Sequence, residues 1–183
     1  MKKVILILVL AAIITTGTAF ADHPSGTGIG IIGFYPGGGG LSLKFSSIPI
    51  YWAVSAGFGG SDSSSYFSLN LTGDSYIIDS ELAAPVHWFL GIGGYFSFYN
   101  WSGKISDVSY GWTDLAFGGR LPIGISIQPI PLLEIFLDVA PCVGLGIYGK
   151  QEYKINDKTE VADDGGMRLH WGWPIELGIR FWF

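Results

Sequence analysis

Hydrophobic and polar residues alternate with a period of two along most of the chain. In segment 168–183, nearly every odd-numbered position is large and apolar, whereas the even-numbered positions hold mainly glycine and polar residues such as Glu176 and Arg180. Segments 113–128 and 132–148 repeat the pattern. Successive side chains of a β-strand point to opposite faces, so the alternation predicts strands with one apolar face.

The same pattern recurs eight times. The predicted strands are 27–35, 40–47, 50–59, 65–78, 86–99, 113–128, 132–148 and 168–183. The connections 47–49, 80–85 and 129–131 are short and contain proline, whereas 36–40, 60–64, 100–112 and 149–168 are polar or glycine-rich and lengthen towards the C-terminus. Short turns at one rim and long loops at the other are typical of a transmembrane barrel. We therefore predict an all-β fold, an eight-stranded antiparallel up-and-down transmembrane barrel.

Two local features weaken the predicted register. The alternation of the fourth segment slips near Gly73 and Asp74. Pro122, Pro141 and Pro174 each remove a backbone donor within a predicted strand. We expect a bulge, or water on the lumen side, at each of them, and the sequence leaves the strand register there open.

Composition decides which face of the strands meets water. Alternation alone also fits a soluble eight-stranded barrel whose apolar face points inward. Only 14% of the residues are charged, and the face opposite the apolar one is mostly Gly, Ser and Ala. Small residues suit the narrow lumen of an eight-stranded barrel, so we predict that the large apolar residues face lipid. Aromatic residues near the strand ends are predicted to form an interfacial girdle, namely Trp52, Trp88, Trp171, Trp173, Phe181 and Phe183.

The N-terminal segment has the organisation of an export signal. Lys2 and Lys3 precede an apolar run at 4–14, and Ala19-Phe20-Ala21 follows as a small-residue cleavage site. The run is too short for a transmembrane helix, which needs about 20 apolar residues. We predict a signal peptide at 1–21, cleaved after Ala21, an outer-membrane barrel at 22–183, and location in a bacterial outer membrane.

The alternation places a small set of charged side chains in the predicted lumen. Three are positive and three negative: Lys44, Arg120, Glu134, Asp138, Glu176 and Arg180. We expect Glu134 to pair with Arg180 on the neighbouring strand, and Asp138 could meet Arg120 diagonally. Such a network could act as a structural plug, or as a gate that opens a narrow water path when its ion pairs change partners.

Two stretches resemble known families. The closing run ELGIRFWF, which ends in Phe183, resembles the terminal signal of bacterial outer-membrane barrels. This resemblance implies that the barrel-assembly machinery reads the last strand during insertion. The runs GGRLPIG at 118–124 and LEIFLDVAP at 133–141, with GLG at 144–146, look like a family of small spirochaete outer-membrane barrels that are similar to OmpA and OmpW barrels. That family implies a fold and no catalytic residues.

Motifs for other chemistry are weak. The pattern G-x-G-x-x-G occurs at 28–33 and 144–149, but no helical pattern follows either match, so no cofactor is expected. The three histidines, His23, His87 and His170, share no metal-ligand spacing. His170 and Asp114 lie near the outer rim without a defined nucleophile, so we do not expect an enzyme. The formal net charge of −5 gives nucleic acid no basic surface to bind.

These observations favour an integral outer-membrane protein with a structural or surface-exposed role and a largely plugged polar lumen. One alternative is a narrow channel or conduit for small or hydrophobic solutes. A second is an adhesin that binds a host or environmental ligand through external loops 100–112 and 149–168. The expected partners are outer-membrane lipid and the assembly machinery.

Overall fold

The computed structural model describes residues 26–35, 38–105, 108–155 and 158–183. The predicted signal peptide, its cleavage site after Ala21 and His23 lie outside these residues. Within the described segments, no helix has the length and apolar character needed to cross a membrane.

The described residues form thirteen strands, all paired antiparallel within one sheet. In chain order they are β1 (Gly28–Tyr35), β2 (Gly38–Lys44), β3 (Tyr51–Ser61), β4 (Ser64–Ala83), β5 (Val86–Ile105), β6 (Val108–Arg120), β7 (Ile123–Ile130), β8 (Leu133–Val139), β9 (Cys142–Tyr148), β10 (Gln151–Ile155), β11 (Lys158–Asp163), β12 (Gly166–Gly172) and β13 (Ile175–Trp182). The prediction of an all-β antiparallel fold is confirmed.

Eight of these strands form a closed ring. The neighbour order runs β5–β4–β3–β2–β1–β13–β8–β7. It returns to its start because β7 also pairs with β5, from Val86 with Ile127 to Leu90 with Ile123. We call this part of the molecule the ring.

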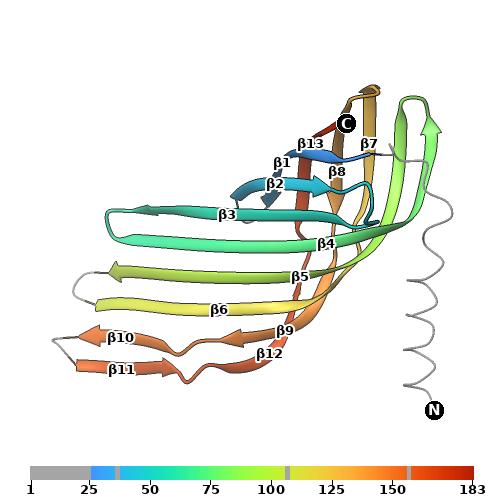
Figure 1. Ribbon diagram of the computed structural model, residues 1–183. Coiled ribbons are helices and arrows are strands. Elements are labelled where there is room, and N and C mark those ends of the chain that lie inside the picture. Colours follow the sequence, from blue (N-terminus) through green and yellow to red (C-terminus); the bar gives the residue numbers. More distant parts are fainter. Residues whose placement is uncertain (1–25, 36–37, 106–107, 156–157) are drawn as a thin grey trace, which may run out of the picture.

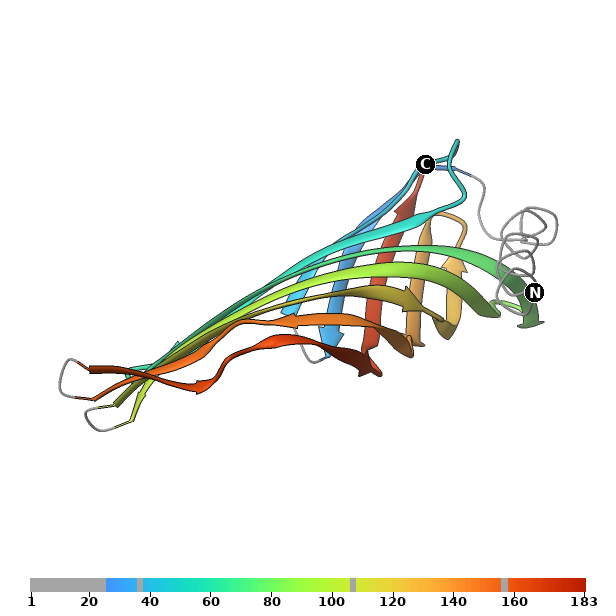
Figure 2. The ribbon, with the colours of Figure 1, turned by 90° about the horizontal axis from the view of Figure 1, so that it is seen from below.

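A second part of the sheet continues beyond the ring. This extension comprises β6, β9, β10, β11 and β12 together with the outer halves of β3, β4 and β5. It projects from the ring as a broad sheet in Figure 1, which Figure 2 shows nearly edge-on. β1 and β2 do not reach into it, because the last β1 pair joins Tyr35 to Ile175 and the last β2 pair joins Gly39 to Ala56. Among the described residues, β12 therefore pairs only with β9, and a notch in the strand pairing separates β12 from β3.

A row of prolines marks the border between the two parts. β6 and β7 are separated at Leu121–Pro122, β8 and β9 at 140–141, and β12 and β13 at 173–174. Backbone bonds still cross each break, from Gly91 N to Pro122 O (2.7 Å), from Leu121 N to Pro141 O (2.9 Å) and from Ala140 N to Pro174 O (2.9 Å). Figure 1 shows the chain changing direction at these three breaks, and we call the line that joins them the crease.

The crease preserves the strand register. Arg120 pairs with Cys142 before the break, and Ile123 pairs with Val139 after it, so no residue is gained or lost. No bulge forms at these prolines, and the register that the sequence left open is continuous across them. A proline lacks its N–H but keeps its carbonyl acceptor, and here each break falls in line with its neighbours, so the ladder bends without slipping.

Two further expectations need correction. Segments 100–112 and 149–168 were expected as external loops, but β5 and β6 continue to Ile105 and from Val108, and β10 and β11 form a hairpin. The irregularity of the fourth segment lies between Tyr76 and Ile78 rather than near Gly73. This β-bulge adds one residue, after which the strand continues to Ala83.

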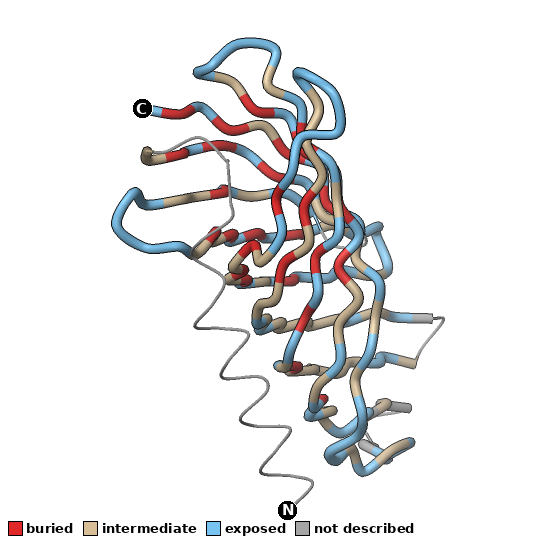
Figure 3. Tube along the Cα trace, turned by 90° about the vertical axis from the view of Figure 1, so that its right-hand side faces the viewer, coloured by how far each residue is buried: buried red, intermediate tan, exposed pale blue. Residues whose placement is uncertain are grey.

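Burial alternates along the ring strands as the sequence predicts. In β13 the inward Glu176, Gly178 and Arg180 are buried, whereas Leu177 and Phe181 on the other face are exposed. Figure 3 shows buried and exposed positions alternating along these strands. Of the residues proposed for the girdle, Trp171, Trp173, Phe181 and Phe183 are exposed, and Trp52 and Trp88 are half-buried.

Candidate functional site

Aromatic side chains fill the inside of the ring near the C-terminal end of β13. The rings of Tyr51, Tyr76 and Phe89 stack in a row, with centroid separations of 4.1 and 4.3 Å. Phe136 and Trp182 pack in the same buried cluster. We call these five residues the aromatic plug. The expectation of a lumen filled mainly by small residues therefore needs correction.

Inward-facing glycines make room for this plug. A Cβ atom on Gly178 would overlap the Phe136 ring, one on Gly124 would lie 2.6 Å from Phe89, and one on Gly28 would lie 3.3 Å from Trp182. Three ring strands thus carry glycine where a neighbouring strand carries an aromatic ring. The glycine-rich face of the sequence indicates close packing of this kind rather than empty space.

Arg180 occupies the centre of the plug. Its Nη1 lies 3.2 Å from Glu134 Oε2, as expected from the sequence, and its Nε donates to Ser42 Oγ at 2.8 Å. The guanidinium lies 3.9 Å from the centroid of the Phe136 ring and 4.8 Å from that of Tyr51. Glu134 also accepts a hydrogen bond from the indole of Trp182 (3.0 Å). The buried charges of Arg180 and Glu134 therefore neutralise each other, and the guanidinium lies against two aromatic rings.

Arg120 forms a second buried cluster next to the crease. Its Nη1 donates to Glu176 Oε1 at 2.5 Å, and its Nε lies 3.0 Å from Asp74 Oδ1 without the alignment of a hydrogen bond. Gly93 pairs with both Asp74 and Arg120, and its missing side chain lets the two charges meet across β5. The expected contact with Asp138 is not formed within the 4.0 Å of an ion pair, and no described residue hydrogen-bonds to Asp138 Oδ1.

The charge balance of the ring also differs from the expectation of three positive and three negative groups. Lys44 lies at the rim, where its Nζ donates to the carbonyls of Phe45 (2.9 Å) and Ile48 (2.7 Å), and it makes no ion pair with a described residue. Five carboxylates are buried, from Asp74, Asp79, Glu134, Asp138 and Glu176, against the two arginines. The sequence alternation did not place Asp79 in the lumen, because the bulge after Tyr76 moves this residue to the inward face. His87 Nδ1 lies 3.6 Å from Asp79 Oδ1.

A pocket of about 280 Å³ lies next to the Arg120 cluster. Its lining includes Phe34, near the end of β1, and His170, on the strand β12 that borders the notch. Its lining includes Arg120 and Glu176, the pair Tyr95 and His170 (2.8 Å from the phenol oxygen to Nδ1), and the apolar Trp173. Two buried polar atoms of lining residues, Arg120 Nη2 and Thr72 Oγ1, have no hydrogen-bond partner among the described residues. The pocket thus combines polar groups with an apolar wall at the side where strand pairing is missing.

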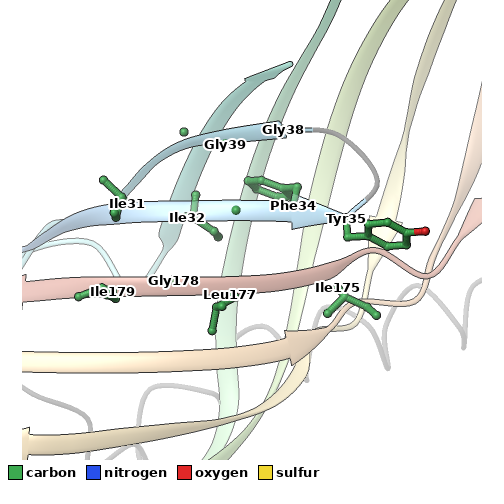
Figure 4. A pocket seen from close by; sticks show the side chains of 12 residues that line it. Ile31, Ile32, Phe34, Tyr35, Gly38, Gly39, Ile175, Leu177, Gly178 and Ile179 are labelled. Atoms are coloured by element: carbon green, nitrogen blue, oxygen red, sulfur yellow. The ribbon is translucent and has the colours of Figure 1, made fainter. Parts of the chain in front are cut away.

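A second depression lies on the outward face of the ring (Figure 4). Its volume is about 660 Å³, and Ile31, Leu177 and Ile179 surround the bare backbone of Gly33 and Gly39. The lining is almost wholly apolar, so this depression offers no group that could orient a polar ligand. It is part of the apolar exterior.

The residues considered for catalysis or metal binding are not assembled into a centre. His170 hydrogen-bonds to Tyr95, and no hydrogen bond or ion pair joins His170 to Asp114 among the described residues. No group of three His, Cys, Asp or Glu residues in the described segments could hold a metal ion.

Comparison with known proteins identifies the family. A family described as "Protein of unknown function (DUF3996)" matches residues 24–169. The chain belongs to this family. No curated protein matches the DUF3996 chain significantly. Among solved structures, a major outer membrane protein from Thermus thermophilus is similar, with a TM-score of 0.54 and 14% sequence identity; the match covers 88% of this chain and 100% of that one. At this identity the likeness concerns the fold alone.

Proposed function

We propose that this DUF3996 protein is an integral outer-membrane protein with a structural or surface-exposed role, and that its ring is a transmembrane barrel closed by the aromatic plug. The main support is the distribution of side chains. Leu41, Ile123, Leu137 and Leu177 are exposed on the outward face, whereas ion pairs are buried inside. A soluble barrel would reverse this arrangement, whereas lipid favours it. The fold of the Thermus protein is consistent with it.

The outward face also suggests where the lipid ends. Along β5, outward residues up to Phe98 are largely apolar, and the next two are Asn100 and Ser102. On β4 the change falls between Phe67 and Ser65. In this proposal the hydrocarbon ends at that level, so the tips of the extension stand in water outside the cell.

The export signal and the assembly signal belong to the same proposal. The last residue, Phe183, exchanges backbone hydrogen bonds with Thr27 (3.1 and 2.9 Å) while its side chain is exposed. An exposed terminal aromatic is accessible to the barrel-assembly machinery. The motifs at 118–124 and 133–141 support a relationship with small spirochaete barrels similar to those of OmpA and OmpW.

Conductance across a planar lipid bilayer tests the plug. The refolded protein is expected to give no discrete conductance steps, because Arg180, Phe136 and Phe89 fill the ring. Replacement Arg180→Ala should remove heat resistance in SDS gels and leave conductance unchanged. Steps in the unaltered protein would contradict the plug. Steps that appear only in the variant, with heat resistance retained, would indicate a gate instead.

The pocket at the notch favours a second function, a conduit for small apolar solutes. A solute could enter from outside and leave sideways into the membrane, since the plug blocks the axial route. Replacement Ser97→Phe would fill the pocket wall, whereas Ser102→Phe on the same strand is exposed and serves as the control. Uptake of an apolar fluorophore by cells should fall only with Ser97→Phe; equal uptake in both variants and in a deletion strain would exclude the conduit.

A further inference from the structure

The inward face of the extension carries a continuous group of aromatic side chains. They come from β4, β5, β6, β9 and β10, and we call them the aromatic strip: Tyr66, Tyr99, Trp101, Tyr110, Trp112, Tyr148 and Tyr153. The strand register places them in three successive rows across the sheet. Ring centroids lie 6.2 Å apart for Tyr66 and Tyr99, 4.4 Å for Trp101 and Trp112, and 6.2 Å for Tyr110 and Tyr153.

An interfacial girdle does not explain this strip. A girdle faces outward, but strand alternation puts Trp101 on the face of the buried Ser68 and Thr72. The outward side of the same region is polar. Asn100 Nδ2 donates to Thr113 Oγ1 at 2.8 Å, and the hydroxyl oxygens of Ser65 and Ser102 lie 2.9 Å apart.

Core packing does not explain the strip either. Tyr66 and Tyr110 are 39% and 37% exposed, and the other rings of the strip are half-buried. No second layer of described strands covers this face, because β1 ends at Tyr35 and the pairing of β2 with β3 ends at Gly39 and Ala56, before the rows of the strip. Exposed aromatic surface with polar surroundings is typical of a binding site, and phenol and indole groups combine apolar contact with hydrogen bonding.

Charge narrows the class of ligand. Three charged groups of the described residues lie next to the strip. Asp114 lies between Tyr99 and Tyr148 in the register, and Glu160 Oε2 accepts from the Tyr153 hydroxyl at 2.6 Å. The third is Arg168, whose guanidinium lies 5.4 Å from the centroid of the Tyr148 ring. Arg168 is neutralised by Asp163 at 2.6 Å, so the strip's described charged neighbours are acidic on balance. An acidic surface repels nucleic acid and anionic glycans.

Backbone pairing disfavours a peptide that binds as an added strand. β5 is hydrogen-bonded to β4 on one side and to β6 on the other along the whole strip, so its backbone offers no free edge. An uncharged sugar chain needs no backbone edge. Its C–H faces can lie against the aromatic rings, and its hydroxyl groups can donate to the Asp114 and Glu160 carboxylates.

We propose that the aromatic strip binds an uncharged glycan. This proposal rests on the proposed outer-membrane orientation in one respect only, namely that the strip binds the glycan outside the cell. Binding by the purified protein therefore tests the strip even if the outer-membrane location fails in cell fractionation.

The experiment uses the refolded full-length protein and an array of hexasaccharides of glucose, mannose, galactose and N-acetylglucosamine, with a heparin hexasaccharide and hexalysine as charged probes. We expect saturable binding of at least one uncharged hexasaccharide and no binding of heparin. The double replacement W101A/W112A should weaken binding by about tenfold or more, because aromatic anchors dominate such interfaces. Ser102→Ala, on the outward face of the same strand, should leave binding unchanged.

Three binding outcomes would overturn the proposal. Absence of binding to every uncharged hexasaccharide does so, as does equal binding by W101A/W112A. Binding of hexalysine alone, lost in the double variant, would assign the strip to cationic peptides. If W101A/W112A loses its heat-resistant mobility in SDS gels, the exposed pair Y66A/Y110A replaces it, with the same expected loss.

Discussion

The ring and the extension share strands but carry their large apolar or aromatic side chains on opposite faces. In the ring, large apolar side chains such as Leu177 point outward and charged ones such as Arg180 point inward. In the extension, Trp101 and Tyr110 lie on the inward face, while Asn100 and Ser102 lie outward. The period of two is unbroken along β5, so the change depends on which residues occupy each face. The difference teaches that alternation predicts a strand, whereas the identity of the apolar face predicts its surroundings.

The two regions also differ in what their ion pairs do. Arg180 and Glu134 are 3% and 0% exposed at their side chains, whereas Arg168 and Asp163 are 53% and 35% exposed. A buried charge that loses its partner is costly, whereas an exposed one is hydrated by water. Substitutions matched between the two regions should separate these cases.

The largest effect is expected from Arg180→Met. This change leaves Glu134 buried beside apolar rings without its cation, which should cost about 3–5 kcal/mol. Unfolding by guanidinium chloride in lipid vesicles, followed by tryptophan fluorescence, measures the loss. The matched change Arg168→Met should leave the unfolding midpoint unchanged. Equal losses in both variants would contradict the contrast between buried and exposed pairs.

A smaller effect is expected from Gly178→Ala. The new methyl group would meet the ring of Phe136 and the carbonyl oxygen of Ile31, so the plug must shift at a cost of about 1–3 kcal/mol. Gly111→Ala, in the extension, meets only ordinary contacts, the nearest being Trp101 O at 3.6 Å, and should change stability by less than about 0.5 kcal/mol. The same unfolding assay compares them; a neutral Gly178→Ala would argue against a tightly packed plug.

Shortening the extension should affect the ring still less. β10 pairs only with β11 and with Ser109–Gly111 of β6 among the described strands. Replacement of 150–164 by Asn-Gly, which favours a two-residue hairpin turn, should retain heat-resistant mobility in SDS gels. Loss of that mobility would show that the ring depends on the hairpin. Oligosaccharide binding should weaken in this variant because Tyr153 is removed.

The smallest effect concerns a single titration. The hydrogen bonds from Arg168 and from the Gly165 N–H hold the pKa of the Asp163 carboxyl below its ordinary value. The contact is therefore fully formed above the ordinary carboxyl range and is lost as pH falls through the lowered pKa. Selectively labelled aspartate carbonyl signals in an NMR titration measure it. Arg168→Met should raise the Asp163 pKa, and an unchanged value would exclude the contact in solution.

Much of the fold could be predicted from the sequence because its strands have one consistent apolar face. The pairing of Glu134 with Arg180 follows from the alternation on two neighbouring strands and agrees with the geometry. The partners of Arg120 could not be predicted in the same way. Asp74 reaches Arg120 across the glycine of a third strand, and that contact depends on a register between segments far apart in the sequence.

The extension was not predicted because its face pattern changes. At 100–112 the alternation continues, but with tyrosine and tryptophan on one side and serine on the other, a composition that also suits a polar loop. The bulge after Tyr76 hid the inward position of Asp79 for a related reason, since one added residue shifts every later side chain to the other face.

The crease allows the extension to change in length independently of the ring. Because the register passes through Pro122, Pro141 and Pro174 without a gain or loss of residues, the hairpin tips can lengthen or shorten by residue pairs while every inward side chain of the ring keeps its position. An odd insertion on the tip side of the crease would reverse the faces beyond it and leave the ring intact. Insertions or deletions of an even number of residues at the hairpin tips are therefore enough to produce relatives with the same ring and very different outer surfaces.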